Sequence, residues 1–582
     1  MENKRQSWFE MPEIRKRFFD KSVWIPLKER SVLLREGSFG YLGYIEEYLG
    51  VSSIAVPLSQ RPEAEKLGWT DIGTRSSNRG YVENGEYITA QTYQNDDKTL
   101  NAEHLVLERG GNRIEASKWD LNQDLTCTLE LKRESDKWYA ISYGYEEVAK
   151  LERDADGRAV NLSIRASYLK DYLCARKMAL YMTSYRSRRQ IVEDRGHIKW
   201  DSPTVEETKS DKWEGRVNEI SEGGDPFGSS YAVFHMSRTD VDYDEDIPEH
   251  GFPTDDNVEA KSWEGKFEGK KLYYIEGELW RNEWIEPALK SHLVCGEEPE
   301  PTTFFITDNN GKSENRKTLV NGIRWLWFNP SVIEAILNIR GSSLGWYTRD
   351  TGTIGCSPGY EVHFGINSIG LINVLAKDIA VLPDWQQKVW AGYNVPPDGK
   401  VSAELLMSQM EAKPASTQAP EEYLPRGIVL LNKLIRDKFG VSVFKEYADA
   451  NKILKRIHRF RAVTKQGLFE LAKDIYRFVG EKIDAEEIKK VVNPKKGEKW
   501  GQLKSLEKLL ALKVGKEAAY SLVSPLWGVY SLRLADSHLP SADISEAYSL
   551  CQIDIKKPGV IQGYQLVDTC VTCIYDICKA LK

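Results

Sequence analysis

With 582 residues the chain is long enough for more than one domain, because a single hydrophobic core rarely grows beyond about 300 residues. Its composition, 41% hydrophobic and 29% charged, is that of a globular protein, and no run approaches the roughly 18 apolar residues that span a membrane. The charged N-terminus lacks the apolar segment of a secretory signal, and eight scattered cysteines suit a reducing compartment. We therefore expect a cytoplasmic protein with no membrane partner.

Charge is distributed unevenly along the chain. The formal net charge is −7, but residues 421–582 hold 28 Lys and Arg residues against 20 Asp and Glu residues, whereas the rest holds 52 against 67. A basic C-terminal part on an acidic body suggests a polyanion as the partner of the smaller part. An ordinary solvated face of a Lys-rich helical domain would produce the same excess.

The first two thirds of the chain predict a mixed α+β body. Residues 1–22 predict a short amphipathic helix or an arm, and residues 23–393 predict the body itself, with length enough for two subdomains. The dipeptide Asn84-Gly85 predicts a β-hairpin, because both residues accept the positive φ angles of a type I′ turn. The alternating pattern of residues 127–132 predicts a half-buried strand.

Two helices are expected within this body. Residues 168–179 carry apolar side chains at helical spacing. A second, shorter helix is expected after Asn329, with Pro330 at its first position and Gly341 beyond its end. Residues 200–265 are polar, and this composition favours a long solvated excursion from the body.

A domain boundary is expected over residues 394–424, where Pro, Ser and Thr are frequent. After it, residues 425–582 predict an all-α bundle, because apolar residues recur there at helical spacing. Trp527, Tyr530 and Leu534 have the i, i+3, i+7 spacing of a buried helix face. The expected helices lie within residues 428–435, 444–460, 468–479, 503–510, 515–538 and 560–581.

The second of these helices would carry a basic face. Cations on such a face would follow an RNA backbone, since phosphate contacts dominate affinity for nucleic acids. A solvated helix face would have the same composition. The candidate nucleic-acid-binding residues are Lys452, Lys455, Arg456, Arg459 and Arg461.

Near the C-terminus, Arg533 and His538 are five residues apart at the end of an expected helix. Histidine exchanges protons near neutral pH, and arginine holds a phosphate with a planar, permanently charged fork. RNA cleavage without a metal needs these groups, because protons must move at the 2′-hydroxyl and at the leaving oxygen while charge builds on the phosphate. Pro540 disfavours helix at the residue before it, so His538 would lie at the helix end and turn toward Arg533.

The segment LRLADSHL at residues 532–539 resembles the R-x4-H signature of the HEPN superfamily, whose all-helical domains include many ribonucleases of antiviral and toxin systems. The resemblance covers roughly the last quarter of the chain. It implies catalytic roles for Arg533 and His538, with Asp536 orienting the imidazole or pairing with the arginine. Leu534 departs from the family pattern, which often has a polar residue there. The structural alternative is an Arg–Asp pair with a capping histidine at a helix C-terminus.

The resemblance implies a metal-independent endoribonuclease that cuts RNA through attack of the 2′-hydroxyl and needs no cofactor. Two copies of the motif would meet across a homodimer interface. The acidic body would sense an unknown trigger or restrain the nuclease, as in effectors of antiviral defence by abortive infection, or in toxins. The alternative function is a non-catalytic HEPN-like module for dimerisation or nucleic-acid binding, with a ligand-sensing N-terminal body.

Other constellations carry weaker signals. The C-x-x-C formed by Cys570 and Cys573 has no second ligand pair in the sequence, so buried hydrophobic cysteines are expected there and not a zinc site. One set of residues mimics the D…E-x-K pattern of restriction-type nucleases, but a plain alternating strand explains the same residues and is the interpretation we prefer. They are Asp120 or Asp124 with Glu130 and Lys132.

Overall fold

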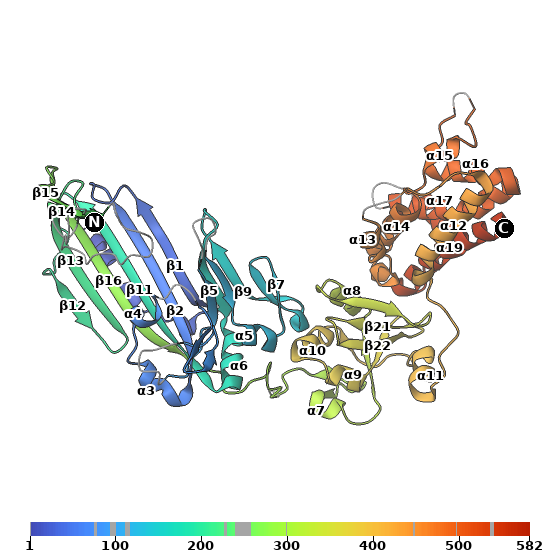
Figure 1. Cartoon of the computed structure of the whole chain (residues 1–582). Helices are drawn as coiled ribbons and strands as arrows, with labels where there is room; N and C mark the ends of the chain where they lie inside the picture. Colours follow the sequence, from blue (N-terminus) through green and yellow to red (C-terminus); the bar gives the residue numbers. More distant parts are fainter. Residues whose placement is uncertain are drawn as a thin grey trace. The chain divides into compact units, whose positions relative to one another are not determined.

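The fold is α+β, as the sequence predicts, with a strand-rich N-terminal half and a helical C-terminal region (Figure 1). This computed structural model divides into two compact units, Met1–Ala140 with Glu146–Pro299, and Ile141–Tyr145 with Glu300–Lys582. None of its described helices is both long and apolar enough to cross a membrane. The described residues are 2–74, 78–93, 100–110, 117–225, 230–238, 258–297, 300–445, 449–495, 498–535 and 541–582.

The first unit is built on a ten-stranded antiparallel sheet (Figure 1). Its central strands are long and bury Val, Ile and Leu side chains, the residue types that fit a pleated surface. In sheet order the strands are β12 (Thr204–Glu207), β13 (Asp211–Ser221), β16 (Lys271–Ile285), β11 (Met178–Val192), β2 (Ile45–Pro57), β1 (Trp24–Glu36), β10 (Ala159–Arg165), β9 (Glu146–Arg153), β8 (Lys137–Ala140) and β7 (Leu131–Glu134).

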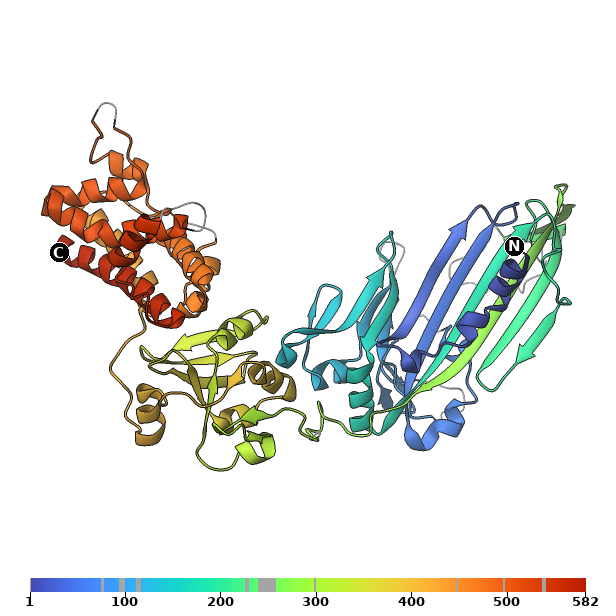
Figure 2. The same cartoon turned by 180° about the vertical axis from the view of Figure 1, so that it is seen from behind.

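The N-terminal segment packs against this sheet, as Figure 2 shows for α1 (Glu2–Glu10). Phe9 is fully buried, and its carbonyl accepts a 2.8 Å hydrogen bond from Trp213 Nε1 on β13. Gly277 on β16 allows this close approach, because a Cβ there would lie 2.6 Å from the Phe9 carbonyl oxygen. Residues 1–22 thus include a helix, as predicted, and buried side chains join it to the sheet.

Local predictions in the first unit have mixed outcomes. The hairpin is confirmed: β3 (Tyr81–Glu83) and β4 (Glu86–Ile88) flank Asn84 and Gly85, whose φ angles are 51° and 84°. The strand predicted over residues 127–132 is wrong at its start, which lies in α5 (Gln123–Thr128). Asn122 begins this helix because its side chain accepts hydrogen bonds from two backbone amides of the first turn.

The described parts of the polar segment 200–265 form strands, which the prediction of a solvated excursion did not include. They supply β12, β13 and the two-stranded ribbon of β14 (Ser230–Arg238) and β15 (Val258–Lys266). In β13 buried and partly exposed residues alternate, with Asp211, Trp213 and Gly215 on the covered side. Charged side chains pair along and across the sheet, which accounts for the polar composition. Lys212 Nζ lies 2.6 Å from Glu214 Oε1 on the same strand, and Arg216 Nη2 lies 3.5 Å from Glu278 Oε2 on β16.

Before its helical region, the second unit has a six-stranded antiparallel sheet and five short helices (Figure 1). The predicted helix after Asn329 is confirmed, and the Asn329 carboxamide accepts a 3.0 Å bond from the Ser331 amide. In sheet order the strands are β20 (Ser343–Trp346), β21 (Thr351–Gly355), β22 (Glu361–Ile366), β23 (Ile372–Leu375), β19 (Trp325–Phe328) and β24 (Asn394–Val395). The helices are α7 (Arg316–Leu319), α8 (Ser331–Leu337), α9 (Ala376–Ala380), α10 (Asp384–Ala391) and α11 (Ala403–Glu411).

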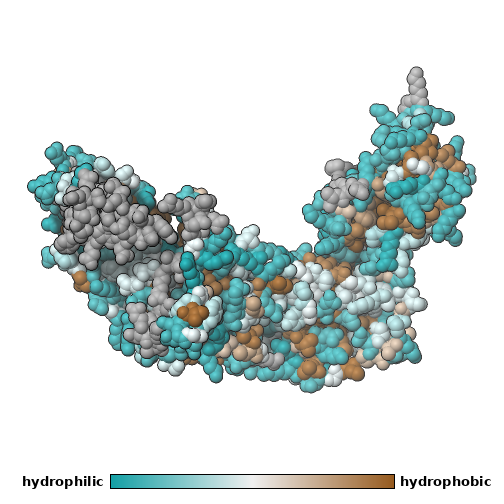
Figure 3. Space-filling model, viewed as in Figure 1, coloured by the Kyte–Doolittle hydropathy of each residue, from teal (hydrophilic) through white to brown (hydrophobic). Residues whose placement is uncertain are grey.

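The helical region of the second unit has its own apolar core. Most predicted helices are confirmed, but the described part of residues 444–460 holds one short helix, Ala450–Leu454, and the start of a second element at Arg459. The region exposes several hydrophobic side chains, and Figure 3 shows brown patches on one face of it. Its elements are α12 (Pro420–Phe439), α13 (Ala450–Leu454), η4 (Arg459–Val463), α14 (Lys465–Val479), α15 (Ala485–Lys489), α16 (Gln502–Val514), α17 (Lys516–Leu534), α18 (Ser541–Leu550) and α19 (Gly559–Leu581).

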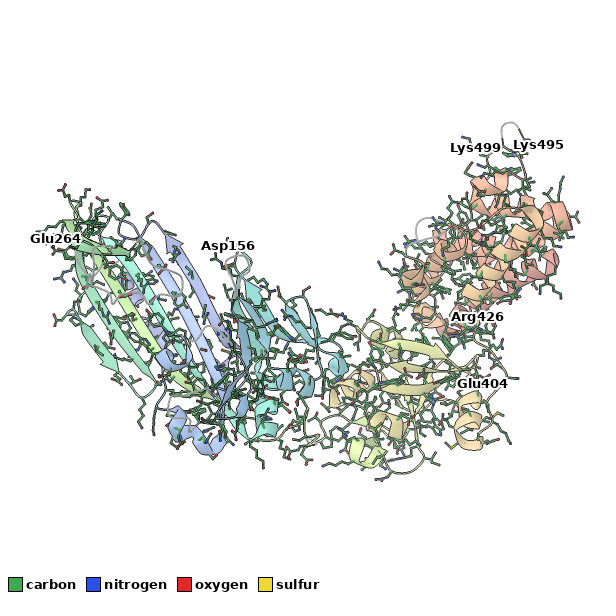
Figure 4. All side chains as sticks on the ribbon, viewed as in Figure 1. Asp156, Glu264, Glu404, Arg426, Lys495 and Lys499 are labelled. Carbon is green, nitrogen blue, oxygen red and sulfur yellow. The ribbon has the colours of Figure 1, made fainter. Side chains whose placement is uncertain are left out.

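The segment predicted as a linker, residues 394–424, contains ordered structure. It holds β24, α11 and the start of α12. Glu404 of α11, labelled in Figure 4, accepts hydrogen bonds from Thr348 Oγ1 at 2.5 Å and Thr417 Oγ1 at 2.8 Å. The core of the six-stranded sheet also includes Phe460 and Val560 from the helical region. Buried apolar contacts therefore join the sheet to the helices within this unit.

Candidate functional site

Arg533 lies in the last turn of α17, and its side chain is 30% exposed. Its Nη1 atom is 3.0 Å from Oε1 of Glu481, whose side chain is 42% exposed. The guanidinium also lies over the ring of Tyr476 from α14, with 4.7 Å between its central carbon and the ring centroid. A surface ion pair and a cation–π contact thus hold this cation while one side stays accessible.

Tyr476 is a support and not a proton acceptor. Burial raises the pKa of its hydroxyl to about 12, and the positive charge of Arg533 opposes this only in part. The phenol is therefore neutral at neutral pH. Tyr530 of α17 completes the aromatic setting, with its ring centroid 5.9 Å from the Arg533 guanidinium carbon.

The other residues of the R-x4-H motif, Asp536 and His538, lie outside the described residues, as does Pro540. The helix that carries Arg533 ends at Leu534, four residues before the predicted end at His538. The predicted buried face was also misplaced, because Leu534 is 36% exposed and Trp527 and Tyr530 are only partly buried. The buried residues of this helix are Ala519, Val523, Leu526, Gly528, Val529 and Leu532.

Arg459 corrects the prediction of a continuous basic face. Its side chain is 1% exposed, and its Nε and Nη2 atoms each lie 2.8 Å from an oxygen of Glu421. Its guanidinium also lies 4.4 Å from the ring centroid of Trp346. The backbone leaves helical geometry before Arg459, and the side chain turns into the protein interior. A buried, paired guanidinium cannot meet a phosphate, so this residue is no nucleic-acid contact in the structure.

The other four cations of this segment have a range of environments. Arg456 Nε lies 3.0 Å from Asp474, a fully buried carboxylate of α14. Arg461 lies 3.9 Å from the same carboxylate and 3.3 Å from Glu334. Lys452 pairs with Asp449 at 2.9 Å, and Lys455 is exposed. Acidic partners therefore neutralise much of the charge that the sequence places here.

A cavity of about 650 Å³ lies beside this segment in the second unit, and Lys455, Arg456 and Arg461 line it. His458, a residue that sequence reasoning missed, lines the cavity as well. Burial lowers the pKa of His458 to about 4, and no described group hydrogen-bonds its Nδ1 atom. A histidine between basic residues has no sequence signal that separates it from a solvated one, because only tertiary packing determines its burial.

The C-x-x-C cysteines and the residues of the D…E-x-K pattern have structural environments. Cys570 and Cys573 are buried, and burial raises the pKa of each thiol. Asp120 is paired with Arg109 and Arg133, and Glu130 has a positive φ angle of 50°. Within the described ranges, no three His, Cys, Asp or Glu side chains are grouped so that they could hold a metal ion.

Comparison of this chain with protein-family models, with curated proteins and with solved structures finds no match. The resemblance to the HEPN superfamily therefore depends on the sequence motif that begins at Arg533 and on the helices around it.

Proposed function

We propose that the helical region of the second unit is a metal-independent endoribonuclease of the HEPN type. The position of Arg533 carries the proposal: its accessible guanidinium lies in the last turn of α17, immediately before the segment with Asp536 and His538. A further long helix, α19, follows this segment, as the resemblance to HEPN domains requires.

In the proposed reaction the 2′-oxygen attacks the adjacent phosphorus and the bond from phosphorus to the 5′-oxygen breaks. The attacking hydroxyl loses its proton to a base, and the leaving oxygen gains one from an acid. His538 exchanges these protons, and Asp536 orients its ring. Arg533 holds the phosphate oxygens with charge-assisted hydrogen bonds as negative charge builds on them. To do so, Arg533 must give up or share its contact with Glu481.

The biological setting belongs to the same proposal. Two subunits pair as a homodimer so that both copies of the motif face one RNA. The protein acts in the cytoplasm as a regulated effector of antiviral defence by abortive infection, or as a toxin, and its N-terminal body responds to a trigger. The acidic excess of that body is consistent with a restraining role toward a basic nuclease, because opposite charges attract.

The test is RNA cleavage by the full chain in EDTA. We expect wild-type protein to cut and both Arg533→Ala and His538→Ala to lose at least about 100-fold in rate, because the first loses charge stabilisation and the second loses proton transfer. Arg477→Ala is the matched control. Arg477 is an exposed arginine on α14, the helix that carries Tyr476, and its variant should cut like wild type. Cleavage by the Arg533 and His538 variants at the wild-type rate would overturn the proposal.

A specific observation favours a second candidate, a non-catalytic module. Arg533 already has a structural role, because it bridges α17 to Glu481 and to Tyr476. In that case the protein would bind RNA or dimerise without cutting. Wild-type protein that binds RNA in a gel-shift assay and cuts none, with or without the trigger, would select this candidate.

A further inference from the structure

The first unit contains a polar cavity of about 290 Å³ beside its large sheet. Part of its wall comes from the paired strands β1 and β2. The other described lining residues are Ile72, Asn78, Arg79, Tyr81, Ala90, Thr92, His104 and Val106. Lys28 of β1 and Ser52 of β2 are direct cross-strand partners and both line the cavity. A β-bulge between Pro26 and Lys28 interrupts the pairing of β1 with β10. Bulges commonly reorient side chains next to binding sites.

The charge of the cavity wall is positive. Lys28 and Arg79 line the cavity, and none of its described lining residues is Asp or Glu. Lys28 is only 7% exposed, and its Nζ atom lies 2.5 Å from Oε2 of Glu108, which is 2% exposed. The same carboxylate also lies 3.0 Å from Arg30, so Glu108 contacts two cations. An anion in the cavity would place a further negative charge beside the buried ammonium group of Lys28, where charge is costly unless it is paired.

The burial of Lys28 affects its protonation. Burial lowers the pKa of its ammonium group, and Arg30 lowers it further, while Glu108 raises it in part. An anion bound beside Nζ would favour the charged form.

Neutral groups of the wall also suit an anion. Asn78 Oδ1 accepts a 2.8 Å hydrogen bond from the Glu108 amide, and this contact fixes the orientation of the carboxamide. Its NH₂ group is then left as a donor. The Ser52 and Ser53 hydroxyls donate to the carbonyls of Ile72 and Leu27 at 3.2 and 2.8 Å, and these bonds hold the strands that form the wall.

We propose that this cavity binds a small organic anion, whose phosphate or carboxylate group is held by Lys28, Arg79 and the Asn78 carboxamide. The volume is at the lower end for ligand pockets, so the ligand is no larger than about a nucleoside monophosphate. Arg79 is exposed and can present two parallel donors to an oxyanion, and Lys28 adds a point charge from the buried side. This site is independent of the proposed nuclease, because binding is measured without RNA.

The test is calorimetric titration of the full chain, at constant ionic strength, with inorganic phosphate, adenosine monophosphate and succinate as probes and adenosine as the neutral control. We expect saturable one-to-one binding of at least one anion and none of adenosine. Comparing the affinities for phosphate and adenosine monophosphate with the affinity for succinate distinguishes a phosphate site from a carboxylate site. If none of the three anions saturates the protein, the proposal is wrong.

Two variants tie the binding to this cavity. Arg79→Gln should lower the affinity for the anion by about tenfold or more, because one charge-assisted contact is lost. Arg158→Gln is the matched control, because this substitution removes the same charge. Arg158 is an exposed arginine in the turn between β9 and β10, and its variant should bind the anion like wild type. Equal affinity of both variants and wild type would overturn the proposal. The double variant Lys28→Met with Glu108→Gln removes both buried charges of the pair together, and it should abolish binding. It also removes one contact of Arg30, whose side chain is 30% exposed, so this loss costs little.

Discussion

Arg459 and Glu421 form a two-point ion pair inside the second unit, with both N–O distances at 2.8 Å and side-chain exposures of 1% and 6%. A further guanidinium nitrogen, Nη1, donates to the backbone carbonyl of Arg349 at 2.8 Å. Burial alone would raise the pKa of the Glu421 carboxyl, but the adjacent Arg459 outweighs this and holds the pKa below its usual value. The pair therefore connects α12 and η4 to the loop that precedes β21.

The first prediction concerns this pair. Arg459→Ala should lower the free energy of unfolding by about 3–5 kcal/mol, because it leaves the Glu421 carboxylate buried without a counter-charge. The double variant Arg459→Met with Glu421→Met should lose much less, since no charge remains to be desolvated. Urea denaturation of wild type, Arg459→Ala and the double variant measures both effects. A loss below about 1 kcal/mol for Arg459→Ala would show that the pair is solvated.

The second prediction concerns pH. His458 is 5% exposed, and its pKa of about 4 in the fold is below the ordinary value near 6.5, so the unfolded chain binds its proton more readily. The burial of neutral His458 stabilises the fold fully above pH 6.5, and this stability is lost as the pH falls toward 4. Between pH 7 and pH 5 the loss should be about 2 kcal/mol. Glu421 raises this pKa and Arg461 lowers it.

The measurement is the urea midpoint of the second unit's transition across pH 5–7, for wild type and His458→Gln. The variant has no titrating ring, so its midpoint should fall less on acidification. Parallel pH profiles for the two proteins would contradict the expected burial of the neutral histidine.

The third prediction concerns helix packing at Gly563 of α19. A Cβ at this position would lie 2.5 Å from the Arg459 carbonyl oxygen and 2.7 Å from Ala462 Cβ. Gly563→Ala should therefore destabilise the second unit by about 1–3 kcal/mol, because backbone on the facing element would have to move. Gly392→Ala is the control, because its nearest contact is an ordinary 3.5 Å and its φ angle is −61°. Thermal unfolding of both variants decides the comparison.

The fourth prediction concerns the partner of Arg533 and rests on the proposed nuclease. Glu481→Gln removes the carboxylate that competes with phosphate, and it should cost less than about 1 kcal/mol of stability because both side chains are partly exposed. RNA affinity should rise, most clearly at low salt, where screening is weakest. A filter-binding assay at two salt concentrations tests this, and lower affinity than wild type would contradict a phosphate-holding role for Arg533.

Apolar spacing alone predicted several elements of the second unit. The helices α14, α16 and α19 were expected from apolar residues at helical spacing, and each buries several apolar side chains. The same reasoning failed for residues 444–460, where Arg459 and Phe460 are both buried in the short 3-10 helix η4. A basic residue in a sequence indicates a solvated surface only when no acidic residue packs against it in the fold. The acidic partner of Arg459 is Glu421, which is 38 residues away in the sequence and could not be predicted from local spacing.

The sequence by itself determined the α+β class, the hairpin at Asn84-Gly85 and the position of Arg533 near a helix end, because these depend on periodicity, turn geometry and capping within a few residues. Only the tertiary structure decided which charges are free. The ion pairs of Lys28 with Glu108 and of Arg459 with Glu421 join positions 80 and 38 residues apart. Such pairs form where packing excludes water. Which charges are buried and paired, and therefore where the candidate sites lie, is decided only when distant segments pack together.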